Sequence, residues 1–383
     1  MHGSPYGPDA VAVEQGTRDK LFIRGRYYSD KSPVPALAMA GVYQVLQWTT
    51  GLVARENPAR FCYLLTLFTS GLAYVISVCT LDGLARALDP FSRLLVTGSF
   101  ALATVALPYA RQVNNHILLL AICCLLLRHF VPRTAVQLIV AGALIGLGYT
   151  IDLGLGPVLV LCVAGLVAWR SRRLRDVILL LAAAFPFFAL HHYLNWRIGG
   201  TFMPANAQPA YFLWPGSPFD ASNLTGSIAH QSVGHFVGYA LDLLFGKRGF
   251  FGHNLALFLA APAAIWLVRR RVAQTPEIVC LGCFCVGGWL VYALTSNNYS
   301  GLCASIRWFV PFLAPAYYVL IRLLERAPQY RKDLLVLSAF GFIMAALMWW
   351  KGPWMTHMVP GFWFLQSAAL IAWLGLRHSW RKS

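Results

Sequence analysis

The sequence predicts an all-α membrane protein that crosses the bilayer many times. Of its 383 residues, 58% are hydrophobic and only 12% are charged, a balance far from that of a soluble domain. Apolar runs close to the length of a membrane span recur from about residue 61 to the end of the chain. Residues 1–33 contain no apolar core of the kind found in a secretory signal peptide, so we expect none there.

Eleven apolar runs are long enough to be predicted as membrane-spanning helices. The run at 34–53 is a further candidate, but it follows Pro33, contains Pro35 and carries Gln44 and Gln47. It is therefore either a twelfth span or a half-inserted or interfacial helix. The eleven predicted spans lie at about 61–80, 93–109, 115–131, 135–150, 154–169, 177–194, 253–268, 278–295, 307–323, 333–350 and 359–376.

The formal charge of +17 comes from 31 Lys and Arg residues against 14 Asp and Glu residues. In a soluble protein this excess would suggest a nucleic-acid partner. Here the basic residues gather in short loops between predicted spans, as they do at cytoplasmic membrane faces, so we expect no nucleic-acid partner. With eleven spans, the basic clusters fall on one face, which is then cytoplasmic together with the C-terminus. The clusters are Arg170, Arg172, Arg173 and Arg175; Arg269, Arg270 and Arg271; Arg322, Arg326, Arg331 and Lys332; and Arg377, Arg381 and Lys382.

The opposite face is predicted to carry the one sizeable loop, residues 195–252. This loop is rich in aromatic residues and in proline, and its stretch Val237–Phe245 could form a short interfacial helix. The chain is thus predicted to divide into four parts. They are an outer loop segment (1–33), an N-terminal transmembrane module (34–194), the long outer loop (195–252) and C-terminal transmembrane helices (253–383).

The segment Gly25–Pro33 places an acid, a base and two phenols directly before the first apolar run. A lysine near a bilayer surface often only extends its side chain toward the headgroups. The sharper hypothesis is that Lys31 binds a lipid-linked phosphate as a point charge. Tyr28 and Asp30 are then candidate substrate contacts, and Asp19 and Asp30 are carboxylates that could act as bases or hold a divalent cation.

Asp152 interrupts an otherwise nearly continuous apolar stretch, residues 135–169. A carboxylate there is costly, which favours a functional role, although an exposed turn between two helices is the alternative. Asn115 and His116 stand at the predicted outer mouth of a span, where a plain polar rim is the alternative. We predict that all three residues bind substrate.

A second polar cluster precedes the predicted span at 307–323. The side chains of Asn297, Asn298 and Tyr299 suit sugar hydroxyls, and Arg307 at the start of the span suits a phosphate or a carboxylate. A solvated loop with an interfacial anchor is the alternative. In the long loop, Arg248 could add a further phosphate contact.

Cysteine spacing predicts neither a metal site nor a disulfide framework. The pattern Cys280-x-x-Cys283-x-Cys285 resembles a metal-ligand spacing, but no His or carboxylate stands beside it, so we favour helix packing. The sequence also contains no GxSxG, HExxH, Walker or DxD motif.

These polar segments resemble a known family in their order and spacing. Thr17–Lys20 followed by Gly25–Pro33 is similar to the first outer loop of GT-C membrane glycosyltransferases. The resemblance is to the bacterial relatives of protein O-mannosyltransferases and of lipid A aminoarabinose transferase. Further similar segments are Asn115-His116, the glycine-rich run before Asp152, Phe202–Pro204, Phe245–Gly249 and Asn297–Arg307.

This resemblance implies the inverting transfer of a sugar from a polyprenyl-phosphate donor. The reaction would take place on the periplasmic face of a bacterial inner membrane, with a lipid, a glycan or a protein as the acceptor and membrane lipids around the protein. Lys31 would hold the donor phosphate, and an outer-loop carboxylate would deprotonate or orient the acceptor hydroxyl. The resemblance leaves open whether a divalent cation takes part.

Members of this family have one span and then an acidic motif before the corresponding loop. The resemblance therefore implies that this chain lacks the first span, with Asp9 and Asp19 as the candidates for the catalytic acid. Two alternatives remain, an inactive truncated relative and a non-enzymatic transporter or flippase of a lipid-linked or polar solute. A transporter would favour inverted repeats, and no repeat is evident in the sequence.

Overall fold

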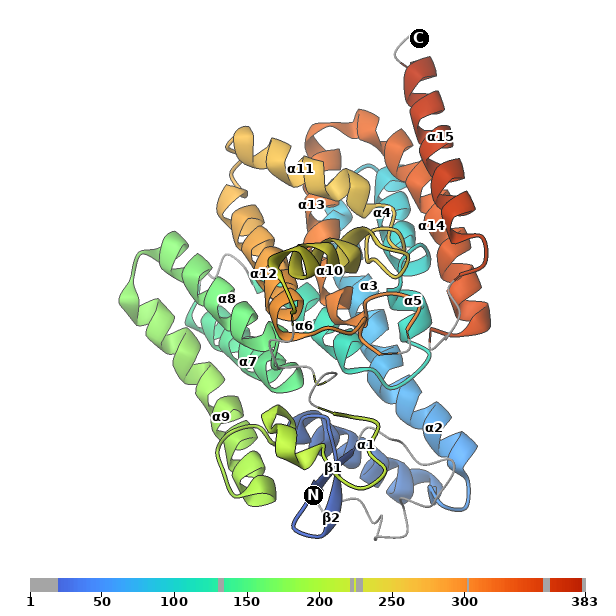
Figure 1. The fold of residues 1–383 in the computed structure, drawn as a ribbon. Coiled ribbons are helices and arrows are strands. Elements are labelled where there is room, and N and C mark those ends of the chain that lie inside the picture. The colour runs from blue at the N-terminus through green and yellow to red at the C-terminus, as the bar shows by residue number, and fades with distance from the viewer. Residues whose placement is uncertain are drawn as a thin grey trace.

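A small two-stranded hairpin lies against one end of a large helical bundle (Figure 1). The computed structural model describes residues 20–129, 134–220, 224, 230–301, 303–353 and 359–380. Apart from the hairpin, the regular elements in these ranges are helices, which confirms the predicted fold class. The hairpin and the end of the last helix, α15 (Phe362–Trp380), lie at opposite ends of the molecule (Figure 1).

The helices follow the predicted apolar runs. Helix α2 (Pro58–Thr66) continues through the π-helical turn η2 (Leu67–Gly71) into α3 (Leu72–Leu84). The 3-10 turn η6 (Arg307–Phe312) leads directly into α13 (Leu313–Arg326). The other helices are α1 (Pro33–Thr50), α4 (Pro90–Leu102), α5 (Ala106–Tyr109), α6 (Asn115–His129), α7 (Ala135–Ile151), α8 (Leu155–Ser171), α9 (Leu174–Gly199), α10 (Val233–Phe245), α11 (Leu257–Arg269), α12 (Thr275–Thr295) and α14 (Arg331–Lys351).

Five helical segments in the described part of the chain are long and apolar enough to cross a membrane. Another five apolar helices are shorter, and α1, α4, α5 and α15 belong to neither group. The helix predicted at 237–245 is present as α10, which starts four residues earlier than expected. The five long segments are Pro58–Ala87, Leu174–Gly199, Thr275–Thr295, Arg307–Arg326 and Pro328–Lys351.

The prediction of one continuous span at 93–109 is wrong, because α4 ends at Leu102 and α5 begins only at Ala106. In this break the amide of Val105 donates to Asn254 Oδ1 at 3.0 Å. In a continuous helix the Val105 amide would donate to a backbone carbonyl oxygen one turn earlier. Here it donates instead to a side chain 149 residues away in the sequence.

Small residues let α7 and α9 pack closely. An alanine Cβ at Gly146 would lie 2.7 Å from the carbonyl oxygen of Ala184, and one at Gly142 would lie 2.2 Å from that of Leu180. Only glycine fits at both positions, and the pair forms the small-xxx-small pattern typical of close helix pairs in membranes.

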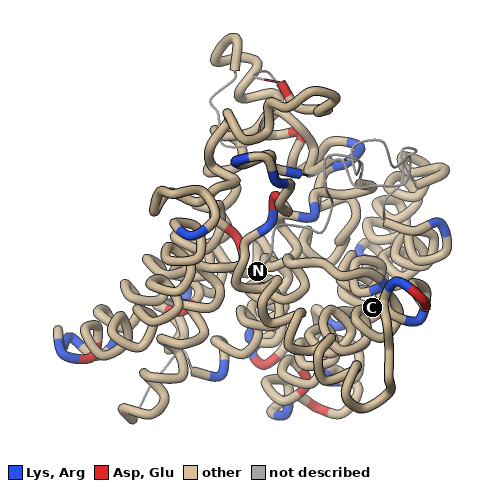
Figure 2. Tube along the Cα trace, turned by 90° about the horizontal axis from the view of Figure 1, so that it is seen from below, with Lys and Arg blue, Asp and Glu red and all other residues tan. Residues whose placement is uncertain are grey.

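Charged residues are few along the chain, and basic ones outnumber acidic ones (Figure 2). Two acidic side chains buried between helices are each neutralised by an arginine. Glu277 of α12 is 1% exposed and accepts from Arg170 Nε of α8 at 2.8 Å. Asp333 of α14 forms a similar pair, because its Oδ1 lies 2.8 Å from Arg377 Nε of α15. Such pairs join neighbouring helices, and an unpaired carboxylate there would be costly.

The hairpin consists of β1 (Lys20–Ile23) and β2 (Arg26–Ser29), which pair antiparallel. Arg24 and Gly25 form the two-residue turn with φ values of 50° and 77°, the conformation that favours glycine. Leu21 and Ile23 pack on the long loop in a small hydrophobic cluster that also contains Ala205, Phe212 and Leu224. The first polar segment and the long loop thus form one layer at this end of the bundle.

Candidate functional site

Asp152 lies in the turn between α7 and α8 and is 6% exposed. Its Oδ1 accepts hydrogen bonds from the amides of Gly154 at 2.8 Å and Leu155 at 2.9 Å, which caps the start of α8. The same oxygen accepts the hydroxyl hydrogen of Tyr292, from α12, at 2.7 Å. The predicted alternative of an exposed turn is wrong, because the carboxylate is buried and fully engaged by three donors.

His116 faces the other oxygen of this carboxylate. It is 4% exposed at the start of α6, and its Nδ1 lies 3.2 Å from Asp152 Oδ2. Its amide donates to Asn114 Oδ1 at 2.9 Å, and the amide of Asn114 donates to Ser70 Oγ at 2.8 Å. His116 is thus held through its backbone, and its Nδ1 faces the carboxylate without forming a hydrogen bond to it.

The surroundings keep the Asp152 carboxylate ionised. Burial by itself raises the pKa of a carboxyl group. The adjacent His116 and the hydrogen bonds from Tyr292 and Leu155 outweigh burial, so the pKa of Asp152 lies below its ordinary value. The pair therefore presents a carboxylate beside an imidazole, an arrangement that fixes which ring nitrogen carries the hydrogen.

Arg307 stands at the start of η6, directly after the loop that follows α12. The amide of Arg307 donates to Ser300 Oγ at 3.1 Å, and Ser300 and Gly301 take φ values of 59° and 83°, so the loop turns back tightly on itself. Next to it, the ring of Trp308 stacks on Tyr292 with centroids 4.3 Å apart and planes 5° apart. The residue that holds Asp152 therefore also positions the segment that carries Arg307.

Lys31 approaches from the hairpin layer. Its ammonium forms an ion pair with Asp30, and its side chain remains 47% exposed. The next residue, Ser32, is buried and has its Oγ 3.2 Å from Nδ1 of His191 on α9. Both Lys31 and Arg307 lie near enough to His116 to act on its ring electrostatically. Two cations that lie far apart in the sequence thus both act electrostatically on one buried imidazole.

Arg248 places a third cation beside the loop between α12 and η6, which contains Tyr299. Its guanidinium lies over the ring of Tyr299, 5.6 Å from the centroid. The Tyr299 hydroxyl donates to Asp242 Oδ2 at 2.6 Å, and burial together with this bond raises the pKa of Tyr299. Arg248 and Arg307 both act electrostatically on the buried Cys303 between them.

The other predicted contacts serve mainly to brace the loops. Asn298 accepts from Tyr239 at its carbonyl oxygen at 2.6 Å, and Asn115 Nδ2 lies 3.4 Å from the carbonyl oxygen of Ile151. Tyr28 is half-buried against the hairpin cluster. Asn297 lies in the same loop as Asn298 and is half-buried.

The two predicted catalytic carboxylates, Asp9 and Asp19, lie outside the described residues. Within the described ranges, no group of three or more His, Cys, Asp or Glu residues could hold a metal ion. Cys280 instead directs its thiol to the carbonyl oxygen of Cys162 at 3.0 Å, in agreement with the interpretation as helix packing.

Sequence reasoning missed Tyr292, Ser32 and His191. Tyr292 and His191 lie within runs that were predicted only as apolar spans. The consecutive pair His191-His192 in such a run was the available signal, because buried imidazoles in a membrane helix are rare without a partner. His192 Nε2 lies 3.0 Å from the hydroxyl of Tyr149, which ties α9 to α7.

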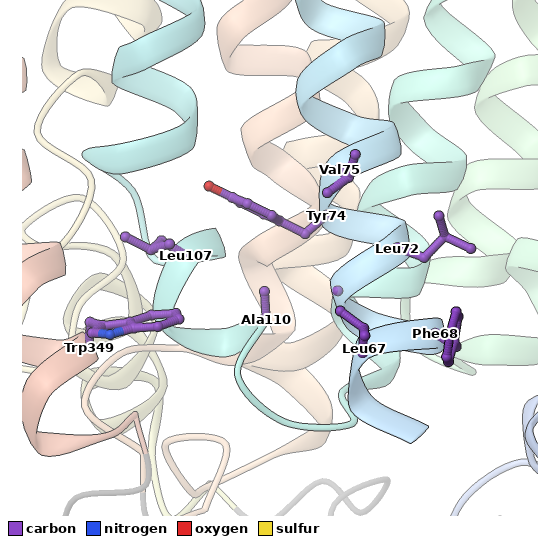
Figure 3. Close-up of a pocket in the computed structure, with 9 residues that line it drawn as sticks. Leu67, Phe68, Leu72, Tyr74, Val75, Leu107, Ala110 and Trp349 are labelled. Atoms are coloured by element: carbon purple, nitrogen blue, oxygen red, sulfur yellow. The ribbon is translucent and has the colours of Figure 1, made fainter. Parts of the chain in front are cut away.

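An apolar groove with a volume of about 460 Å³ opens on another part of the bundle (Figure 3). Figure 3 shows Leu67 and Leu72 on one wall and Leu107 and Trp349 on the other, from α2–α3, α5 and α14. Helix α5 separates this groove from the polar loop, since the hydroxyl of its Tyr109 donates to the carbonyl oxygen of Ser305 at 2.9 Å.

No protein-family model matches this chain, and no curated protein matches its sequence. Among solved structures, the chain is similar to the crystal structure of ArnT from Cupriavidus metallidurans bound to undecaprenyl phosphate. The TM-score is 0.51 at 14% sequence identity. The chain shares the fold of that structure. The match covers 83% of this chain and 53% of that one, so this chain spans about half the length of the solved protein.

Proposed function

We propose that this protein is a membrane glycosyltransferase that moves a sugar from a polyprenyl-phosphate donor to a lipid, glycan or protein acceptor. The observation that carries the proposal is the gathering of Lys31 and Arg307 around the buried His116–Asp152 pair. This cluster occurs in a fold similar to that of ArnT, whose structure was determined bound to undecaprenyl phosphate.

The three cations suit the chemistry of such a donor. When the bond between the sugar and the phosphate breaks, negative charge grows on the departing lipid phosphate. Lys31, Arg307 and Arg248 would stabilise that charge most strongly in a partly dehydrated site at the membrane surface. We assign Tyr28, Asp30, Asn115, Asn297, Asn298 and Tyr299 to contacts with the sugar and the acceptor, and we keep Asp9 and Asp19 as candidate catalytic carboxylates.

We place the site on the periplasmic face of a bacterial inner membrane. Basic clusters gather in the loops that precede α9 and α12, and the hairpin layer lies at the opposite end of the molecule from the end of α15 (Figure 1). The hairpin packs on the long loop, which supports the division of the chain at 1–33, 34–194, 195–252 and 253–383, with the first and third parts as one outer layer.

Reconstitution tests this proposal. The protein is placed in liposomes with undecaprenyl-phosphate-linked sugars and a bacterial lipid extract as the source of acceptor, and release of undecaprenyl phosphate is measured. We expect release by the wild type, a loss of about 100-fold or more in Lys31→Ala and Arg307→Ala, and normal release by Arg60→Ala, an exposed cation at the start of α2. Full release by both site variants would refute the proposal.

A transporter or flippase of a lipid-linked or polar solute is the second candidate. Its support is the break between α4 and α5, because transporters often use broken helices. Uptake of a solute into the same liposomes without any sugar transfer would favour this candidate. An inactive truncated relative would show neither activity.

A further inference from the structure

The His116–Asp152 pair has the geometry of a proton-accepting dyad. Oδ1 of Asp152 already accepts three hydrogens, from two amides and from Tyr292. Oδ2 faces Nδ1 of His116 at 3.2 Å, and the side chain is only 4% exposed. Because its Oδ1 is saturated by three donors and its Oδ2 faces the ring, the carboxylate is placed to orient the imidazole.

The remaining nitrogen of His116 has a distinct environment. With Nδ1 facing Asp152 Oδ2 at 3.2 Å, Nε2 is the ring nitrogen left to accept a hydrogen from outside the pair. The charged groups that act on this ring are Asp152, Arg307 and Lys31. A phosphate bound by the two cations would therefore lie next to the imidazole.

We propose that His116 is the general base that takes the proton from the acceptor hydroxyl, with Asp152 as its positioning residue. This inference rests on the proposed function. In the step, the acceptor oxygen forms a bond to the anomeric carbon of the sugar while its proton moves to His116 Nε2. The bond between that carbon and the phosphate oxygen breaks, and the electron pair leaves with the polyprenyl phosphate.

Charge balance supports this assignment. The step adds a positive charge at the imidazole and a negative charge at the departing phosphate, which Lys31 and Arg307 hold close by. The two new charges attract one another in a site of low dielectric, and the Asp152 carboxylate stabilises the imidazolium in the same way. His116 thus supplies a base among the described residues, where the predicted acids Asp9 and Asp19 are not described.

Two variants of His116 test the proposal in the full-length reconstituted protein. Transfer is measured as undecaprenyl phosphate release, and binding is measured with undecaprenyl phosphate alone. We expect His116→Gln to reduce transfer by about 100-fold or more while binding changes by less than about threefold. We expect His116→Gly to lose transfer equally and to regain a measurable part when free imidazole is added, which a merely structural role would not allow.

Asp152→Asn is the matched test of the positioning residue. The amide keeps the size of the side chain and can still accept from Tyr292, but it no longer stabilises an imidazolium. We expect transfer to fall by about 100-fold or more, with undecaprenyl phosphate binding retained and no rescue by imidazole.

The outcomes distinguish a failure of the base assignment from a failure of the proposed function. Transfer by His116→Gln within about threefold of the wild type would overturn the base assignment and leave the proposed function intact. A loss of binding that equals the loss of transfer, or no imidazole rescue of His116→Gly, would also overturn it. An absence of transfer by the wild type would sink the proposed function and this inference together.

Discussion

The hydroxyl of Tyr292 donates to Oδ1 of Asp152 at 2.7 Å, across 140 residues of sequence. The ring of Tyr292 also occupies the space beside Gly154, where an added Cβ would lie 2.7 Å from the ring carbon Cζ. The ring of Trp308 stacks on the face of the Tyr292 ring. One aromatic residue thus aligns the carboxylate on one side and the segment of Arg307 on the other.

Tyr292→Phe removes this hydrogen bond and keeps the stacking. We expect a loss of about 1–2 kcal/mol in stability, because a buried charged group loses one donor. We also expect transfer to fall about tenfold while undecaprenyl phosphate binding stays unchanged, since the carboxylate would be less well aligned. Tyr74→Phe is the control, because the Tyr74 hydroxyl bonds only to the carbonyl oxygen of Ala101 in the described part of the chain. Equal transfer by Tyr292→Phe and the wild type would contradict this role.

Ser32→Ala tests the link between the hairpin layer and α9. The Ser32 hydroxyl lies 3.2 Å from Nδ1 of His191 and directly follows Lys31 in the sequence. We expect KM for the lipid donor to rise about threefold to tenfold, with kcat nearly unchanged, because Lys31 would be less firmly placed. Ser171→Ala, at the C-terminal end of α8, should leave both constants unchanged. A fall in kcat alone would argue against this role.

Gly146→Ala tests the close packing of α7 and α9. The new Cβ would lie 2.7 Å from a backbone oxygen that has no room to move, so we expect a loss of about 1–3 kcal/mol and a lower Tm in detergent. Gly165→Ala on α8 is the matched control, since a Cβ there meets nothing within 4 Å. It should stabilise the helix by up to about 1 kcal/mol. Equal Tm values for the two variants would contradict the packing described here.

The buried His253 should make the folded protein less stable in acid. It is fully buried in the turn before α11, with Nδ1 2.9 Å from the carbonyl oxygen of Gly249, and burial lowers its pKa from 6.5 to about 4. Between these two values the unfolded chain binds a proton that the native state does not. Stability should therefore fall as the pH is lowered through this window, by up to about 3 kcal/mol.

The check is thermal unfolding of the detergent-solubilised protein from pH 7 to 4. His253→Asn should flatten the slope, and His378→Asn, at an exposed position near the end of α15, should not. An unchanged slope in His253→Asn would assign the acid sensitivity to other groups.

The sequence was sufficient to predict most of the helices, and it also indicated several of the candidate site residues. Apolar runs of span length have a single physical solution, so the helices and the burial cost of Asp152 could be predicted locally. Lys31 and Arg307 also stood out, because cations beside apolar runs are conspicuous.

Long-range pairings could not be predicted in this way. Nothing local shows that Tyr292 meets Asp152 or that Asn254 ends α4, because each contact depends on how distant helices pack. The hairpin at 20–29 was likewise predicted only as a loop segment, since its strands are held by the long loop through Trp214, whose Nε1 donates to the carbonyl oxygen of Lys20 at 3.1 Å.

The central claim is that Lys31 and Arg307 hold a lipid-linked phosphate beside His116 and Asp152. Its most direct test is the equilibrium binding of undecaprenyl phosphate to the protein in lipid nanodiscs. We predict saturable binding by the wild type and by Arg60→Ala, weakened by about tenfold or more in each of Lys31→Ala and Arg307→Ala. Equal affinity in all four proteins, or no saturable binding by the wild type, would contradict the claim.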